Sequence, residues 1–124
     1  PDHMRTATSR VRLAEAMLHT GDAAGAEPLL RSAIATFAAI NPRLWRVGDA
    51  RARLGEVLLA LGRTQEGIGD VTTGWEIYTE TTAASTPRAR EIATGAADYY
   101  QKNAETTLAE AWRERAALPA GQNR

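Results

Sequence analysis

The chain has 124 residues, enough for one domain with a modest hydrophobic core. Its 15 basic and 15 acidic residues cancel, so the overall charge gives no reason to expect nucleic acid or an anionic membrane as a partner. Cysteine is absent, which excludes disulfides, thiol catalysis and thiolate metal sites, and fits a reducing compartment such as the cytoplasm. No apolar stretch approaches the roughly 20 residues of a membrane span. We therefore expect a cytoplasmic domain that binds neither nucleic acid nor membrane.

Residues 1–4 resemble what a protease site and a cloning site leave behind, and they are left out of the fold prediction. A first helix is expected from about Thr8 to Thr20, and Gly21 ends it. Besides the apolar positions Leu13 and Met17, this helix has a second apolar face, formed by Val11, Ala14 and Leu18. Nothing in the chain is expected to cover that second face. The pattern indicates a piece of a longer chain, or a homodimer formed through the first helix.

The second helix is predicted to begin after the N-cap residue Asp22 and to end near Ile40, before Asn41 and Pro42. The connection over residues 43–48 carries Trp45. That side chain is expected to cover the junction between repeats, with a role as a binding anchor as the alternative.

A third helix is predicted over about 49–61, and Gly62 closes it in the same way as the first. Thr64 is the expected N-cap of a fourth helix, which ends in the threonine-rich stretch before residue 83. Thr86 and Pro87 give the signal for a fifth helix, at its N-cap and its first position.

The last part of the chain allows two interpretations. Thr107 and Glu110 have the spacing of a capping box, which predicts a separate sixth helix. Alternatively, one bent helix runs over 87–118. Residues 119–124 are predicted to be a disordered tail.

An internal repeat organises these helices. The segment RVRLAEAMLHTG, residues 10–21, returns as RARLGEVLLALG, residues 51–62, at a period of 41 residues. The second helices match at the same offset, because the small and large residues of one face alternate in the same order: Ala26, Leu30, Ala33 and Phe37 correspond to Gly67, Val71, Gly74 and Tyr78. This predicts a single all-α domain over residues 5–118, made of stacked helix pairs with units at about 7–43, 48–84 and 87–118.

The repeat resembles the tetratricopeptide repeat. In the second copy that family's pattern is matched by Leu54, Gly55, Gly62, Gly67 and Gly74, and in the first by Leu13, Ala14, Gly21, Ala26 and Ala33. Arg10 and Arg51 replace the family's large aromatic residue, and the longer period is similar to the kinesin-light-chain type. The resemblance implies a short right-handed α-solenoid of five to six helices. It also implies a scaffold or regulatory function, in which the concave face binds a peptide or helix of another protein.

The sequence offers no catalytic, cofactor or metal site. His19 stands alone on its helix and is expected to be an exposed residue near the helix end. We therefore expect no enzymatic activity and no cofactor in this chain. Two alternatives to a partner-binding scaffold are a regulatory domain of a larger bacterial enzyme, such as a Ser/Thr protein kinase, and a self-association module.

The resemblance places the candidate partner-binding residues on the first helix of each unit: Val11, Arg12, Glu15, His19, Asp49, Arg53, Glu56, Glu91, Asp98 and Gln101. Glu15, Glu56 and Asp98 would form an acidic row, which favours a basic partner. Arg12 and Arg53 precede the first two of these by three residues, the spacing of partial ion pairs on a helix. The alternative interpretation of these charges is a solvated surface without a partner.

Overall fold

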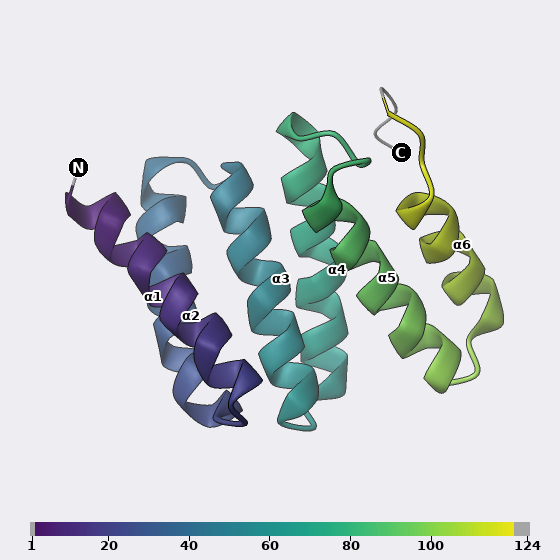
Figure 1. The fold of residues 1–124 in the computed structure, drawn as a ribbon, viewed down its shortest axis with the longest axis horizontal. Helices are drawn as coiled ribbons and strands as arrows, with labels where there is room; N and C mark the ends of the chain where they lie inside the picture. The colour runs from purple at the N-terminus through teal and green to yellow at the C-terminus, as the bar shows by residue number, and fades with distance from the viewer. Residues whose placement is uncertain (1, 121–124) are drawn as a thin grey trace.

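The computed structural model describes residues 2–120, in which six helices and no strand are found. The helices are α1 (Asp2–His19), α2 (Ala23–Ile40), α3 (Trp45–Ala60), α4 (Thr64–Thr81), α5 (Pro87–Lys102) and α6 (Thr106–Ala116). They form three antiparallel pairs, α1 with α2, α3 with α4 and α5 with α6, and adjacent pairs meet through α2 against α3 and α4 against α5. Figure 1 shows the pairs side by side in chain order. This is the all-α, solenoid-like stack that the repeat predicts.

The turns inside the three pairs are built alike. Gly21 and Gly62 have positive φ angles of 92° and 81°, as predicted for residues that follow a helix end. The third turn uses Ala104 instead, with φ 59°. In each case the next N–H closes the helix end by donating to a carbonyl five residues back, as Glu105 does to Tyr100 at 2.9 Å. The turn therefore keeps its geometry in the third unit although its glycine is missing.

The helix starts confirm some of the predicted caps and correct others. Asp22 caps α2 by accepting a hydrogen bond from the N–H of Gly25, and Thr86 caps α5 in the same way. Thr64 is the first residue of α4 and not its cap, because Arg63 takes the N-cap position without a side-chain hydrogen bond. Trp45, which was predicted to lie in a loop, is the first residue of α3, so this helix begins four residues earlier than expected.

The third unit consists of two helices, so the alternative of one bent helix is wrong. The predicted capping box is not formed, since α6 begins at Thr106 after the N-cap residue Glu105, again without a side-chain hydrogen bond. At the other end of the chain, residues 2–4 belong to α1, and Met4 packs against the first core. The predicted disordered tail lies outside the described residues from residue 121 on.

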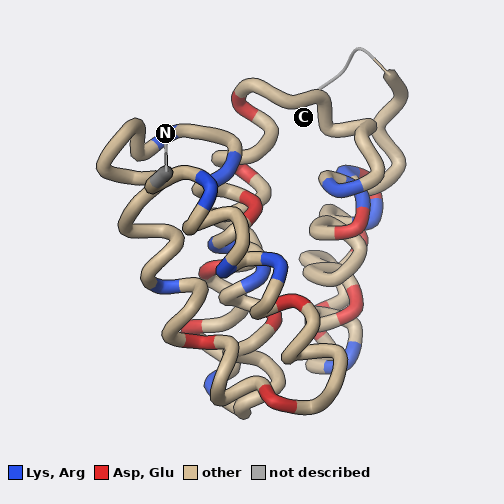
Figure 2. The backbone as a smooth tube through the Cα atoms, turned by 60° about the vertical axis from the view of Figure 1, so that its left-hand side comes forward, with Lys and Arg blue, Asp and Glu red and all other residues tan. Residues whose placement is uncertain are grey.

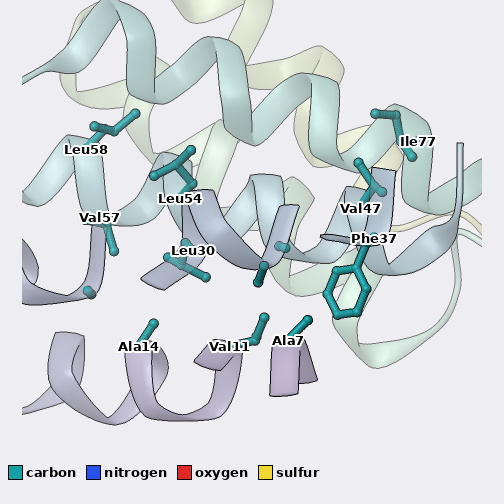
Figure 3. Packing of buried hydrophobic residues seen from close by; sticks show 13 residues of the cluster. Ala7, Val11, Ala14, Leu30, Phe37, Val47, Leu54, Val57, Leu58 and Ile77 are labelled. Atoms are coloured by element: carbon teal, nitrogen blue, oxygen red, sulfur yellow. The ribbon is translucent and has the colours of Figure 1, made fainter. Parts of the chain in front are cut away.

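The first core corrects the prediction about the first helix. Val11 and Ala14, which were expected to be uncovered, are buried, and Leu18 packs against the same core. Figure 3 shows α1 directing Val11 and Ala14 toward α2 and α3, where Leu30 belongs to the same core. The large apolar side chain that α1 exposes is instead Leu13, at 52%. Apolar residues occur all round this helix, so periodicity alone cannot tell which face is covered.

Glycines allow the two helices of the middle pair, α3 and α4, to approach each other closely. A Cβ atom placed on Gly74 would lie 2.6 Å from the carbonyl oxygen of Gly48, and one on Gly55 would lie 2.6 Å from that of Gly67. Real Cβ contacts are not this short, so the two backbones touch where side chains would normally separate them. The small positions of the repeat are therefore the crossing points of α3 and α4.

The middle pair also belongs to both cores of the domain. The first core joins α1 and α2 to one side of this pair, through residues such as Val57 and Leu58. The second joins its other side to α5 and α6, around Trp75, whose ring meets that of Trp112 edge-on at 5.3 Å. None of the helices described is long and apolar enough to cross a membrane.

Candidate partner-binding groove

The inner face of the stack, formed by α1, α3 and α5, carries a cavity of about 220 Å³. We call it the acidic cavity, because three carboxylates stand at its wall, one from each of these helices: Glu15, Glu56 and Glu91. Arg53 and His19 complete the polar lining. The remaining lining is apolar and consists of Ala14, Leu18, Leu30 and Val57.

A second cavity of about 210 Å³ continues the groove between α1 and α3 toward the start of α1. We call it the aromatic cavity, after the two rings among its lining residues, Thr8, Val11, Arg12, Glu15, Phe37, Trp45, Arg46, Asp49 and Arg53. The two cavities share Glu15 and Arg53, whose side chains form an ion pair with 2.6 Å between Oε2 and Nη1. This ion pair is thus the partition between two compartments of one groove.

The partition belongs to an ion-pair network that spans the three inner helices. From Arg53 the network continues to Asp49, at 3.2 Å, and Asp49 in turn accepts from Nε of Arg88 at 2.7 Å. Arg88 also contacts Glu56, at 3.3 Å, and Glu91. In Figure 2 basic and acidic positions accordingly lie close together within the stack rather than on separate faces.

The network holds more negative than positive charge. Its two guanidinium groups, of Arg53 and Arg88, face the four carboxylates of Glu15, Asp49, Glu56 and Glu91. Two negative charges are therefore left in excess within the network. Because the guanidinium groups and Asp49 are the most buried members, the excess charge is presented by the three glutamates.

Burial shifts the proton affinities in this network. The pKa of Glu56 is raised, chiefly because burial penalises its charged form, and the nearby Arg88 and Arg53 only partly oppose this. For Arg88 burial acts to lower the pKa, but the carboxylates of Glu56 and Asp49 outweigh it and the pKa is raised. Arg88 stays charged, and its buried Nη2 atom has no hydrogen-bond partner among the described residues.

Eight of the ten predicted binding residues line the two cavities: Val11, Arg12, Glu15, His19, Asp49, Arg53, Glu56 and Glu91. Val11 is buried and forms part of the floor. Asp98 and Gln101 line neither cavity. Asp98 instead pairs with Arg113 of α6 at 3.1 Å, and Glu91 is the acidic residue of α5 that lines the acidic cavity.

The predicted pairing of charges within each helix is also corrected. Arg53 does not pair with Glu56 three residues later but with Glu15 on the neighbouring unit and with Asp49 on its own helix. The charges thus connect units in addition to stabilising single helices. Arg12 forms no ion pair in the described part of the chain and faces the aromatic cavity.

Sequence reasoning missed Arg88, the most connected residue of the network. A signal for it exists, because the spacing Arg-x-x-Glu occurs once on each of α1, α3 and α5, as Arg12 with Glu15, Arg53 with Glu56, and Arg88 with Glu91. The first two are 41 residues apart and the last two only 35. A search at one fixed period therefore aligns Asp98 with the earlier glutamates, whereas the charge pattern identifies Glu91.

The comparisons with known proteins do not assign the chain to a family. No protein-family model matches the sequence, and no curated protein matches it either. Over residues 2–120 the structure brings together no group of three or more His, Cys, Asp or Glu side chains that could hold a metal ion.

Proposed function

We propose that the domain is a non-catalytic protein-interaction module that binds a basic segment of a partner protein in the groove between α1 and α3. The observation that carries this proposal is the convergence of Glu15, Glu56 and Glu91 on one cavity. The resemblance of the repeat to the tetratricopeptide family agrees with it, since that family uses the same inner face for partner segments.

The chemistry of the acidic cavity suits the side chain of an arginine or lysine. Such a side chain has an aliphatic stem, which packs against apolar walls, and a charged head, which pairs with carboxylates. Leu18 and Val57 supply the apolar wall, and the glutamates supply the acceptors. A volume of about 220 Å³ is below the usual size of a cofactor or drug-sized pocket. It matches a single inserted side chain.

A peptide selection tests the proposal directly. Random twelve-residue peptides displayed on phage are selected on the parent domain and on Glu56→Lys, which reverses the charge of the central glutamate. We expect the parent to enrich peptides with an arginine or lysine and the variant to lose that preference. Glu110→Lys is the matched control, because Glu110 is exposed on α6 and lines neither cavity. If the parent enriches nothing over an empty support, the groove is not a peptide site.

Salt gives a second readout on any peptide so obtained. Exposed charges are screened more strongly at about 0.15 M than at about 0.01 M ionic strength, so the affinity for the parent falls as salt is added. On Glu56→Lys the affinity at low salt is expected to be on the order of tenfold weaker, because an attraction becomes a repulsion. Equal affinities of parent and variant at both salt concentrations would leave the glutamates as a merely solvated surface.

Self-association is a second candidate that one observation favours. Leu13 lies on α1 with 52% of its surface exposed and is not part of either core. A second copy covering it would form a homodimer through the first helix, by a residue other than those the sequence indicated. Sedimentation of the parent and of Leu13→Gln over rising concentration separates the two functions.

A role as regulatory domain of a larger enzyme, such as a bacterial Ser/Thr kinase, would use the same groove. The length of the gene that encodes this domain tests that alternative.

A further inference from the structure

A third cavity, of about 430 Å³, lies at the start of α1 and is lined by Met4, Arg5, Thr8, Ser9, Arg12 and Arg46. We call it the arginine cavity. It shares Thr8, Arg12 and Arg46 with the aromatic cavity, which in turn shares Glu15 and Arg53 with the acidic cavity. The three compartments therefore form one continuous path along α1.

The arginine cavity has the opposite charge of the acidic cavity. No carboxylate stands in its lining, and among the side chains described, those of residues 3–120, none forms an ion pair with Arg5, Arg12 or Arg46. This differs from the rest of the inner face, where Arg53 and Arg88 are each held by carboxylates. Three guanidinium groups at one end of the path thus keep their hydrogen-bond donors available.

Arg46 is fixed in place without using those donors. Its guanidinium carbon lies 4.5 Å from the centre of the Trp45 ring and 6.0 Å from that of Phe37. Such stacking orients the planar group through the ring faces and leaves its N–H groups directed elsewhere. Trp45 is therefore the support of a positively charged group at the entrance to the groove.

We propose that the groove is selective for a dipolar segment, which places a basic side chain in the acidic cavity and an Asp or Glu side chain in the arginine cavity. This inference rests on the proposed function and specifies its partner. The occupant is an extended stretch of a partner protein, because the charges of the two end cavities complement a chain that carries both signs. A nucleic acid is disfavoured, since its phosphates would meet the two excess negative charges of the network.

The geometry also sets the distance between the two charges of the partner. The residues that α1 contributes to the two end cavities are centred about nine positions apart, or roughly 13 Å along the helix. An extended chain covers about 3.3 Å per residue. The acidic residue is therefore expected about four positions from the basic residue.

The peptide selection described above tests this when a second variant is added. Peptides are selected on the parent, on Arg5→Gln combined with Arg12→Gln, and on Arg10→Gln as the matched control, since Arg10 is on the same helix and lines none of the three cavities. On the parent and the control we expect a basic and an acidic residue at the stated spacing. On the double variant the basic residue stays and the acidic preference disappears. Arg5 and Arg12 are exposed, so the unfolding midpoint is expected to stay near that of the parent.

Synthetic peptides then give the quantitative result. Replacing the acidic residue of a selected peptide by glutamine is expected to weaken binding to the parent about fivefold, and to leave binding to the double variant unchanged. Selected peptides that are basic but carry no acidic residue would overturn this inference and leave the proposed function standing. An equal effect of the replacement on parent and double variant would overturn it too. If the parent enriches no peptide, both the function and the inference are wrong.

Discussion

Gly48 of α3 and Gly74 of α4 face each other so closely that neither has room for a methyl group. A Cβ on Gly74 would also lie 2.7 Å from the backbone nitrogen of Ala52, one turn further along α3. The atoms in the way belong to the backbone, so they cannot move aside as the end of a flexible side chain can. The spacing of the two helices is thereby set by these glycines.

Substituting Gly74 tests this relationship. We expect Gly74→Ala to lower the free energy of unfolding by about 1–3 kcal/mol, and Gly74→Leu by at least as much, because the pair must separate to admit the new atoms. Gly69→Ala is the matched control on the same helix, since nothing lies within 4 Å of a Cβ placed there. It is expected to gain about 0.5–1 kcal/mol from its better helix propensity. Urea unfolding measures both, and a shift in the same direction for both variants would show that the repeat register is wrong.

The turn between α5 and α6 offers a stabilising substitution. Ala104 has a φ angle of 59°, a region that costs a side-chain-bearing residue roughly 1–2 kcal/mol. Ala104→Gly removes this cost, and after the entropy of the unfolded chain is subtracted we expect a gain of about 0.5–1 kcal/mol. Ala117→Gly serves as the control, because Ala117 has an ordinary φ of −103° and gains nothing. Thermal unfolding compares the two, and a lower melting temperature for Ala104→Gly would contradict the turn geometry.

Arg88 should contribute more to stability than its exposed counterparts. Its side chain retains 14% exposure and serves three carboxylates, so Arg88→Gln leaves several acceptors without a charged donor. We expect a loss of about 1–3 kcal/mol. Arg113→Gln removes the pair with Asp98, whose partners are about half exposed, and is expected to cost less than about 1 kcal/mol. Similar losses in urea unfolding for the two variants would mean that the network adds nothing beyond a surface ion pair.

The raised pKa of Glu56 predicts a particular dependence of stability on pH. The folded state holds the proton of Glu56 more tightly than the unfolded chain, so this residue destabilises the fold as pH rises from its ordinary value of 4.5 through the folded pKa. Glu56→Gln has no carboxyl group at this position and therefore avoids that loss. Its free energy of unfolding relative to that of the parent should increase as the pH rises over this range. Glu66 provides the opposite case, because hydrogen bonds from Arg31 and Arg63 lower its pKa, and stability is lost as pH falls. Unfolding at a series of pH values checks both directions, and parallel curves for parent and Glu56→Gln would refute the assignment.

The local features of the fold were readable from the sequence because they depend on neighbouring residues. A glycine after a helix needs only its own φ angle, as at Gly21, and an N-cap needs only an N–H three residues on, as at Asp22. The prediction for Trp45 was wrong because its position depends on residues far away in the sequence. Its helix starts without a side-chain cap, and the place of Trp45 is set by contacts with distant residues such as Tyr78, whose ring it meets edge-on at 6.1 Å.

The candidate site was predictable as far as the repeat is regular. Glu15, Arg53 and Glu56 were placed on the inner face because the first two units share one period. Glu91 was missed because Arg88 and Glu91 follow Arg53 and Glu56 by 35 residues and not by the period of the first two units, which points to Asp98 instead. The basic end of the groove could not be foreseen, since Arg5 and Arg46 come from different helices and only packing brings them to one cavity.

The middle helix pair, α3 with α4, belongs to both cores, and this determines how the molecule can open. If α1 and α2 detach, the first core is lost and the second is kept, and the reverse holds for α5 and α6. Only the detachment of α3 and α4 costs both cores at once, so it has to coincide with global unfolding. Amide protons of Val57 and Trp75 should consequently exchange with solvent only through that rare event, while those at the two ends exchange through separate partial openings. The groove lies between α1, which belongs to the first helix pair, and α3, which belongs to the middle pair. The wall formed by α1 can therefore move in a partial opening while the wall formed by α3 stays in place.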